Sequence, residues 1–441
     1  MPTGELRRNR IDRMIALAQA YRGWTSGELC EALGREPRRA APGSGNPKLD
    51  LIARLADALD WEVGEVAESV WDPSQRDTNC GSDGVSFDAL DDRAQQEHRR
   101  GRFREMEATG LAMRRIARDA RERAIAANRL AGAYDGLGRY PKVLDCVREG
   151  LAERGIGGDL RLMLTVNLAN ANYTLWNLQE SQSISTALLE QRFAGASLAT
   201  TDQSRLQRVG RAFCHAIRGH SERRMLPQCE GDGETRARAQ RAITDLTAAE
   251  RLYEELAADF GDHQYMGLSN TARGGILEAR VAAGELDCDE AVQTIIEHLD
   301  EAVRMDDGCG PDVPSVHTLE SWGWWSIFGA NIALRGGSTE ARPHSERSDY
   351  ERALAICTNK AAEIADHLDS WPMRERAFTL EWFRRQDVAG DEGPSFRDWM
   401  LDTEDVRVLV GTMGRFPLFR ATGWRILDRA TLVGPCSAAF A

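Results

Sequence analysis

The sequence predicts an all-α protein in which a small helical domain precedes a longer array of paired helices. Apolar residues recur every three to four positions through most of the 441-residue chain, which is the period of an amphipathic helix. Clusters of glycine, proline and polar residues divide the chain into segments of helical length. From residue 126 onward, small and large apolar residues recur with the spacing of stacked helical pairs. We expect a domain over residues 1–72, a linker over 73–90, the array over 91–369 and a C-terminal segment over 370–441.

Composition narrows the class of protein. Hydrophobic residues make up 42% and charged residues 28% of the chain, the proportions of an ordinary soluble protein. The start of the chain shows no signal-peptide pattern, and its longest apolar run, residues 322–334, is too short to cross a bilayer. The nine cysteines are scattered and form no Cys-x-x-Cys pair. We therefore expect a cytoplasmic protein with reduced thiols and no metal site.

Four helices mark the N-terminal domain. Gly23 follows the first helix and suits a left-handed helix stop. Thr25 is placed to cap the second helix, and Glu28 completes a capping box. Gly34 ends that helix. The apolar stripes of the four helices are Ile11, Met14, Ile15 and Ala18; Leu29, Ala32 and Leu33; Leu49, Ile52, Leu55, Ala56 and Leu59; and Trp61, Val63, Val66 and Val70.

A basic segment, residues 35–41, lies between the second and third stripes. Two short helices across a glycine-containing turn, with basic residues on the second, form the layout that inserts a helix into a DNA major groove. Trp24–Gly34 and Asn46–Leu59 resemble the corresponding parts of the phage-repressor-like (XRE-type) helix-turn-helix family. Ser26 stands where that family usually has glutamine. The span between Gly34 and Pro47 is also shorter than usual, so the recognition helix is expected to be stubby.

The resemblance implies a DNA-binding face for double-stranded DNA. Arginine forks suit guanine edges, and lysine and serine side chains suit phosphates. The predicted DNA-binding residues are therefore Thr25, Ser26, Arg35, Arg38, Arg39, Ser44 and Lys48. Residues 1–48 hold nine positive and five negative side chains, a net charge of +4, which leaves −17 for the rest of a chain that totals −13. A basic head on an acidic body directs DNA to the head. The alternative is a head that only packs against a partner.

The array is clearest at residues 126–147, where Leu130, Ala131, Tyr134, Gly138, Tyr140, Val143 and Val147 resemble a tetratricopeptide repeat. Small residues let paired helices approach, and large ones fill the space to the next pair. Tyr140 and Leu178 would be equivalent, 38 residues apart, which is close to the family period of about 34. The other units are Leu168, Ala169, Tyr173, Leu178 and Leu188; Gly275, Ala279, Gly284, Ala291 and Ile295; and Trp325, Ala330, Tyr350, Ala353 and Cys357. An irregular bundle is the alternative.

Breaks in the array are expected at residues 220–234, 306–314, 335–349 and 390–394. The C-terminal segment is interpreted as a cap on the array. Within it, residues 406–410 (Val-Arg-Val-Leu-Val) are strand-like in composition, although a lone strand is unstable.

A concave wall of first helices would present polar side chains to a ligand, namely Asn128, Asn170, Tyr173, Asn270 and Asn331. Asparagine offers both a donor and an acceptor to an extended peptide. Glu254, Glu255 and Asp259 add negative charge nearby in sequence, which favours a short cationic peptide. The alternative is that the asparagines bond neighbouring helices or water.

No catalytic pattern is evident: the chain has no Gly-rich loop ending in Gly-Lys-Ser/Thr, no His-Glu-x-x-His and no Gly-x-Ser-x-Gly. We predict no enzyme activity, catalytic residue, cofactor or metal. His215, His220 and His263, with Cys214 or Cys229, are interpreted as packed residues, and so are Trp322, Trp324 and Trp325.

The combination of an XRE-type head and a tetratricopeptide-like body resembles bacterial peptide-responsive transcription regulators. That resemblance implies a homodimer whose repeat groove binds a peptide or protein and thereby changes affinity for a two-half-site operator. The competing interpretation is a helical-repeat scaffold or adaptor whose vestigial head does not bind DNA. A basic face that stays accessible favours the first; one buried in an internal interface favours the second.

Overall fold

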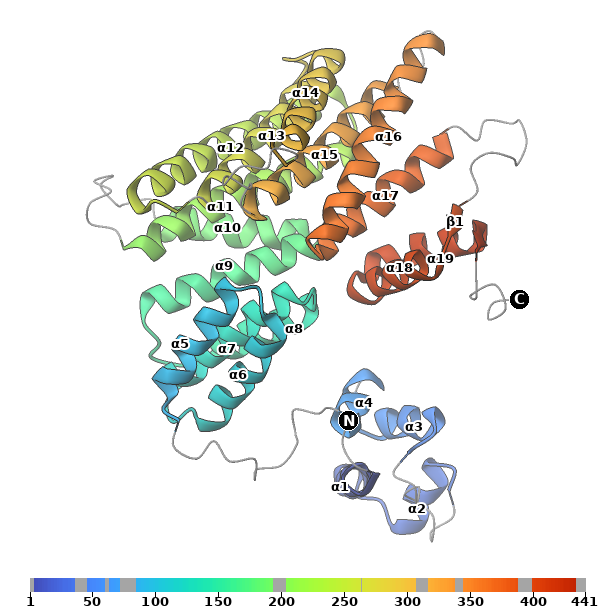
Figure 1. The fold of residues 1–441 in the computed structure, drawn as a ribbon. Coiled ribbons are helices and arrows are strands. Elements are labelled where there is room, and N and C mark those ends of the chain that lie inside the picture. Colours follow the sequence, from blue (N-terminus) through green and yellow to red (C-terminus); the bar gives the residue numbers. More distant parts are fainter. Residues whose placement is uncertain are drawn as a thin grey trace. The chain divides into compact units, whose positions relative to one another are not determined.

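A computed structural model of the chain describes residues 4–35, 46–59, 63–71, 85–192, 204–262, 264–306, 316–337, 344–387 and 399–433. Over these residues the protein is all-α, as predicted, with nineteen α-helices, two short 3-10 helices and one two-stranded sheet. The chain divides into two compact units, Met1–Val85 and Ser86–Ala441, each of which is described by itself (Figure 1).

The first unit has four helices around one core: α1 (Gly4–Arg22), α2 (Ser26–Ala32), α3 (Leu49–Leu59) and α4 (Val63–Trp71). The predicted stripes are confirmed for α1 and for Leu29 and Leu33 of α2, all of which are buried. Two stripe residues were predicted wrongly, since Leu49 is 74% and Val63 is 40% exposed. Each is the first residue of its helix and lies to one side of the face that packs. In α3 that face centres on Leu51, Ile52 and Leu55.

Local sequence signals set the ends of α1 and α2. Gly23 and Gly34 have φ values of 66° and 63°, the left-handed conformation that glycine adopts without a steric penalty. After each glycine, a backbone amide bonds back to a carbonyl in the last turn: Trp24 to Gln19 at 3.1 Å, and Arg35 to Cys30 at 2.8 Å. Both predicted helix stops are confirmed.

The helices of the second unit run from α5 to α17 before a small C-terminal subdomain (Figure 1). Ser86 caps α5, the first helix of this unit, which starts at Phe87. The bounds are α5 Phe87–Arg99, α6 Phe103–Ile116, α7 Ala120–Gly136, α8 Tyr140–Ala152, α9 Gly158–Thr174, α10 Leu178–Arg192, α11 Arg205–Arg224, α12 Asp232–Phe260, α13 Gln264–Ala283, α14 Cys288–Asp306, α15 Val316–Gly337, α16 His344–His367 and α17 Trp371–Asp387.

Each helix of this unit packs against the next one in the sequence, and the odd-numbered helices also contact one another in succession from α5 to α17. The odd-numbered helices therefore form one continuous layer. The pairs α7–α8 and α9–α10 have the predicted equivalence, because Tyr140 and Leu178 are the first residues of α8 and α10. Both side chains are buried.

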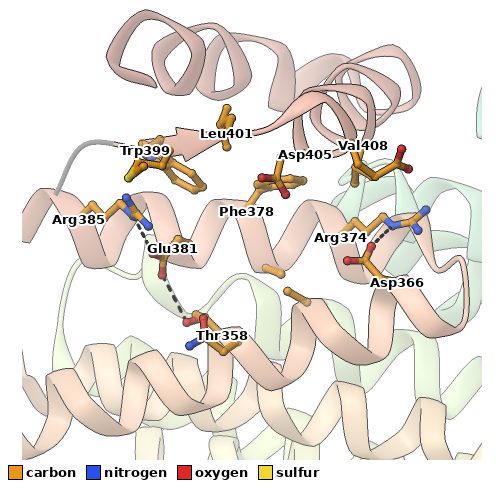
Figure 2. A pocket seen from close by; sticks show the side chains of 15 residues that line it. Thr358, Asp366, Arg374, Phe378, Glu381, Arg385, Trp399, Leu401, Asp405 and Val408 are labelled. Atoms are coloured by element: carbon orange, nitrogen blue, oxygen red, sulfur yellow. Dashed lines mark hydrogen bonds and ion pairs between the residues drawn. The ribbon is translucent and has the colours of Figure 1, made fainter. Parts of the chain in front are cut away.

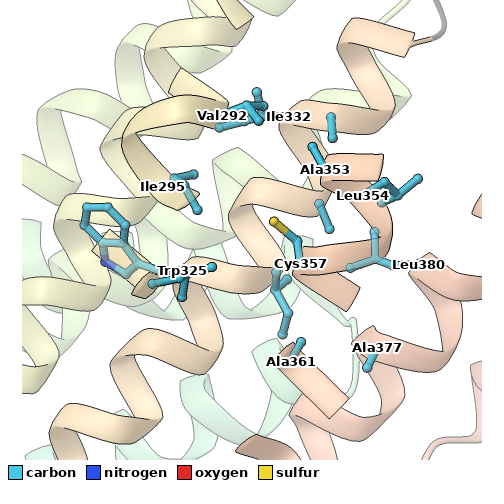
Figure 3. Packing of buried hydrophobic residues seen from close by; sticks show 14 of the residues in the cluster. Val292, Ile295, Trp325, Ile332, Ala353, Leu354, Cys357, Ala361, Ala377 and Leu380 are labelled. Atoms are coloured by element: carbon cyan, nitrogen blue, oxygen red, sulfur yellow. The ribbon is translucent and has the colours of Figure 1, made fainter. Parts of the chain in front are cut away.

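The largest core of this unit joins α14, α15, α16 and α17 (Figure 3). Ile295, Trp325 and Cys357 meet there, each 3% exposed or less. A close approach at Gly329 allows this contact, since a Cβ atom there would lie 2.9 Å from both Cys357 Sγ and Ile295 Cγ2. The apolar residues predicted for the last unit, including Tyr350 and Ala353, belong to this core.

The C-terminal subdomain consists of β1 (Trp399–Leu401), α18 (Thr403–Arg415), a 3-10 turn (Pro417–Phe419), α19 (Arg420–Arg429) and β2 (Ala430–Leu432). The two strands pair in parallel, with Trp399 opposite Ala430. Residues 406–410, which are strand-like in composition, lie in α18. Asp402 starts that helix: its side chain accepts the amides of Glu404 and Asp405.

This subdomain also reaches back to an early part of the array. Arg415 Nε donates to the carbonyl of Leu137, and Tyr140 belongs to the same buried cluster as Trp399, Val406 and Phe416. It therefore contacts the α7–α8 turn as well as α17.

Two predicted breaks differ from the structure. α11 continues through His220 to Arg224, because the charged side chains at its end are buried rather than solvated, and Glu222 and Arg223 form ion pairs there. α15 extends to Gly337 and α16 starts at His344, so the break there is shorter than predicted. The predicted break at 390–394 lies outside the described residues. So does the break at 306–314, apart from residue 306. Among the described helices, none combines the length and apolar character needed to cross a membrane.

Candidate functional site

The first helix turn of α2 in the head is held by a capping box. Thr25 Oγ1 accepts the amide of Glu28 at 3.4 Å, and Glu28 Oε2 accepts both the amide and the hydroxyl of Thr25 at 2.8 Å. The backbone hydrogen bond from Thr25, followed by its side-chain hydrogen bond, lowers the pKa of Glu28. The predicted capping box is confirmed, and the Thr25 hydroxyl is occupied within the head.

Ser26, the next residue, is arranged differently. Its Oγ accepts a hydrogen bond from Gln19 Nε2 at 3.4 Å, which leaves its hydroxyl proton available to an outside acceptor. Ser26 and Lys48 are exposed, and Arg35 is half-buried directly after the end of α2. Arg38, Arg39 and Ser44 lie outside the described residues.

Other arginines of the head stabilise helix ends. Arg22 donates to the carbonyls of Ala58 and Asp57, both at 2.8 Å, at the end of α3. Arg54 donates to the carbonyl of Ala32 at 3.3 Å, at the end of α2. Cations at helix C-termini complement the helix dipole. These arginines therefore hold the head together.

In the second unit, the structure separates the predicted groove residues. Asn170 and Tyr173 line a cavity of 260 Å³, and Asn331 lines an adjoining cavity of 840 Å³. Asn128 and Asn270 line neither of them. Asn128 accepts a bond from Asn167, and Asn270 donates to Ser321, so each joins neighbouring helices.

The two cavities share Arg224 and Trp324 and lie along the odd-numbered helices. Trp324 therefore has a place on a cavity wall, whereas Trp325 is buried in the core as predicted. The acids proposed to attract a cationic peptide do not line these cavities: Glu254 pairs with Arg273, and Asp259 pairs with Arg208. The larger cavity is instead rich in arginine. Its charged lining residues are Arg223, Arg224, Arg335, Arg376, Glu278 and Glu375.

Arg223 is a paired cation. Its Nη1 lies 2.6 Å from Glu278 Oε2, and both side chains are less than 10% exposed. Burial alone would lower the pKa of Arg223, but the charge of Glu278 and its hydrogen bond raise it. Asn331 donates to the same carboxylate at 3.2 Å. One of the predicted groove residues thus supports this ion pair.

Arg224 differs from its neighbour. Its side chain donates to the backbone carbonyl of Tyr173 at 2.9 Å and lies over the rings of Tyr173 and Trp176, at 3.8 and 4.6 Å from their centroids. It forms no ion pair within the described part of the chain. Burial lowers the pKa of Arg224 to about 10.

The smaller cavity has an acidic side. Burial, and then the charge of Glu320, raise the pKa of Asp135 to about 6. His220 lies between Tyr173 and Phe328, with ring centroids 6.3 and 6.0 Å away. Burial, and then the charges of the two arginines that follow it, lower the pKa of His220 well below its usual value. The imidazole is therefore neutral at pH 7.

A third hollow of 470 Å³ separates α16 and α17 from β1 and α18 (Figure 2). Both arginines that line it have carboxylate partners: Arg374 pairs with Asp366 at 2.9 Å, and Arg385 pairs with Glu381 at 2.6 Å. Glu381 also accepts a hydrogen bond from Thr358 at 3.4 Å. The cations of this cleft are therefore balanced within it.

The candidate histidine cluster does not assemble in the described structure. His215 Nδ1 lies 2.9 Å from Asp245 Oδ1, whereas His220 packs against aromatic rings, and His263 lies outside the described residues. Within the described ranges, no three His, Cys, Asp or Glu side chains are grouped as metal ligands.

Sequence reasoning missed the residues that define the larger cavity, namely Arg223, Arg224, Arg376 and Trp176. Arg223 and Arg224 fell inside a predicted break. Trp176 had a signal: it stands 38 residues after Gly138, at the equivalent place in the next helical pair. No known family model and no curated protein matches this chain.

Proposed function

We propose that this protein is a DNA-binding transcriptional regulator. In this proposal the first unit binds double-stranded DNA, and the helical array of the second unit senses a peptide or other ligand and holds two copies together. The observation that carries the proposal is a net-positive N-terminal segment within a compact helical unit that has its own core. Residues 1–48 carry a net charge of +4. Residues 49–85 of the same unit hold two positive and nine negative side chains, a net charge of −7, and the second unit carries the remaining −10 of the chain's −13.

The geometry of the head supports DNA binding. Helix α2 is capped at Thr25 and ends at Gly34, at the boundaries expected from the XRE-type resemblance. Ser26 and Lys48 are exposed, so both are accessible to a phosphate backbone. Arg35, Arg38 and Arg39 are the proposed base-reading residues.

The geometry of the array supports ligand sensing. Successive contacts among the odd-numbered helices are those expected of a tetratricopeptide-like solenoid, and the cavities lie along this layer. A cavity of 840 Å³ lies within the size range of ligand pockets, about 300–1,000 Å³. Dimerisation and a cytoplasmic location follow from the resemblance to ligand-responsive regulators.

One observation favours the adaptor alternative. Arg22 and Arg54 donate hydrogen bonds to backbone carbonyl groups inside the head, and Arg10 Nη1 donates to the carbonyl of Val70 at 3.3 Å. Part of the positive charge of the head is therefore structural. The test must distinguish overall charge from the proposed DNA-binding residues.

That test is binding of the full chain to a fluorescent pool of its own upstream DNA across a salt series. We expect a specific complex whose affinity falls by more than tenfold in Arg38→Ala/Arg39→Ala. For Lys48→Ala, we expect the slope of log affinity against log salt to become shallower by about 1, the effect of one lost phosphate contact.

The matched control is Arg104→Ala/Arg115→Ala, which removes two exposed arginines of α6 and changes the net charge by the same amount. This variant is expected to bind DNA like the unmodified protein. Weak binding that ignores sequence and responds equally to both double variants would reject the regulator and favour the adaptor.

A further inference from the structure

The larger cavity holds two arginines whose charge is not balanced by an ion pair in the described structure. Arg224 is only 8% exposed, and its one hydrogen bond goes to a backbone carbonyl. Arg376 lines the same cavity, with its guanidinium carbon 4.8 Å from the centroid of the Trp176 ring, and likewise forms no ion pair with a described residue. Both cations therefore share one indole ring.

The nearby carboxylate is already engaged with other groups. Glu375 accepts hydrogen bonds from Trp176 Nε1 at 3.3 Å and from Thr379 Oγ1 at 3.1 Å. Glu278, the other acid of the cavity, pairs with Arg223. A guanidinium has five N–H donors in a planar fork. After the bond to Tyr173, Arg224 keeps donors that no described side chain accepts.

Burial without a counter-charge is costly for both arginines. Burial lowers the pKa of Arg224 to about 10, and the charges of Arg223 and Arg376 act in the same direction. Burial also lowers the pKa of Arg376. An arginine paired with a carboxylate shows the opposite shift, as Arg223 does. An anion that entered the cavity would relieve this cost.

The aromatic wall of the site is itself held at an energetic cost. Trp176 has a φ of 66° at the end of α9, a conformation that a bulky residue rarely adopts. The equivalent turns after α7 and α13 have Gly138 and Gly284, with φ values of 68° and 73°. Non-glycine residues held in this region are strained, and such residues cluster at ligand sites. The tryptophan places its ring against both unpaired arginines.

We propose that the larger cavity binds an organic anion, whose carboxylate or phosphate group pairs with Arg224 and Arg376 beside the Trp176 ring. Planar guanidinium groups form paired hydrogen bonds with either group. The apolar surface of Trp324 and the remaining volume accommodate the rest of the ligand. The idea that this ligand controls DNA binding rests on the proposed function. The existence of the anion site does not.

The test titrates the full chain at constant ionic strength with four probes. They are inorganic phosphate, benzoate, a pool of random tetrapeptides with free C-termini, and the same pool with amidated C-termini. The melting temperature and tryptophan fluorescence are recorded. We expect saturable stabilisation by phosphate, or by benzoate and the free-acid peptides but not the amidated pool. The first result identifies a phosphate site and the second a carboxylate site.

Arg224→Gln and Arg376→Gln should each weaken that binding by at least tenfold. The control is Arg208→Gln, on the same helix as Arg224, whose cation pairs with Asp259 outside the cavity; it should bind as tightly as the unmodified chain. No saturable response to any probe, or equal responses from all three variants, would overturn the proposal. Should an arginine variant fail to fold, Trp176→Gly replaces it, and unchanged anion affinity in that variant would also count against the site.

Measuring DNA binding on the same samples separates the two proposals. Anion binding without specific DNA binding would reject the regulator and keep the site. Specific DNA binding without any anion response would keep the regulator and reject the site.

Discussion

The cavity on the odd-numbered helices and the cleft between α17 and α18 use the same types of charged side chain in opposite ways. In the cleft, Arg374 and Arg385 have carboxylate partners within 3 Å. In the cavity, Arg224 has none among the described residues. Since paired charges need nothing from outside, the cleft is explained by folding alone. Balance of charge, and not the number of charged residues, distinguishes a ligand site from a structural contact.

The neighbours Arg223 and Arg224 provide the strongest test of this distinction. Arg223→Met should lower the free energy of unfolding of the second unit by about 3 kcal/mol or more, because it leaves the Glu278 carboxylate buried without its cation. Arg224→Met should leave that free energy unchanged or increase it, because it removes an unpaired buried charge. Urea unfolding followed by circular dichroism measures both.

Equal losses in the two methionine variants would show that Arg224 stabilises the fold as much as its paired neighbour does. The argument for a ligand would then lose its main support. The single variants Glu278→Gln and Arg223→Met should be non-additive, since each removes the same ion pair.

Two carboxylates extend the comparison to pH. Burial alone would raise the pKa of Glu381 in the cleft, but hydrogen bonds and charges from Arg384 and Arg385 lower it. In the smaller cavity, burial raises the pKa of Asp135 to about 6. Ionised Glu381 therefore stabilises the fold above its ordinary pKa, and this contribution is lost as the pH falls. Asp135 acts in reverse: its contribution is present below its ordinary pKa and is lost as the pH rises through 6.

At pH 7.5 we expect Glu381→Gln to destabilise the second unit by about 2 kcal/mol, the value of hydrogen bonds to a charged group. Asp135→Asn should raise the melting temperature by about 1–2 °C, which is roughly 1 kcal/mol for a unit of about 350 residues. Both differences should shrink below about pH 4, where the free carboxyl groups are protonated in either state. Melting curves from pH 3.5 to 8 measure this, and shifts of the same sign at pH 7.5 would contradict the comparison.

Sequence reasoning was accurate where a few neighbouring residues decide the structure. The Thr25–Glu28 capping box, the stops at Gly23 and Gly34, and the equivalence of Tyr140 with Leu178 were all predicted and are all observed. Each depends on backbone geometry or on helical spacing over one or two turns. Composition alone was a poor guide at residues 406–410: their strand-like residues lie in a helix that starts at the Asp402 cap.

The cavity depended on contacts that local patterns do not contain. Trp176 bonds to Glu375, 199 residues further along the chain, and Arg223 pairs with Glu278, 55 residues away. From sequence, the charged run after residue 220 suggested a solvated loop. Only the packed helices show that the run is buried and that one of two adjacent arginines lacks a partner. The predicted asparagines were closer to helix–helix contacts than to the main cavity, with Asn331 as the exception.

Two neighbouring hydroxyl groups in the head also differ in whether they are satisfied internally: that of Thr25 is, and that of Ser26 keeps a free donor. The expected effect on stability is the smallest of those predicted. Thr25→Ala removes the two hydrogen bonds of Thr25 Oγ1 with Glu28, keeps the bond from the residue 25 amide to the Glu28 carboxylate, and should destabilise α2 by about 1 kcal/mol. Hydrogen exchange of the full chain, followed by mass spectrometry, should show about fivefold faster exchange over residues 26–33. Ser26→Ala should leave that exchange unchanged, because its hydroxyl only accepts an exposed bond from Gln19.

For DNA affinity we expect the opposite order, with a larger loss in Ser26→Ala than in Thr25→Ala. Under the proposed function, the free hydroxyl proton of Ser26 donates to a phosphate, so Ser26→Ala should weaken binding about fivefold, the value of one hydrogen bond near 1 kcal/mol. Thr25→Ala should weaken it only to the extent that α2 opens. Faster exchange in both variants would assign Ser26 to folding. Unchanged DNA affinity in Ser26→Ala would mean that the Ser26 hydroxyl does not contribute a phosphate contact. Lys48 and the arginines would then remain as the proposed contacts.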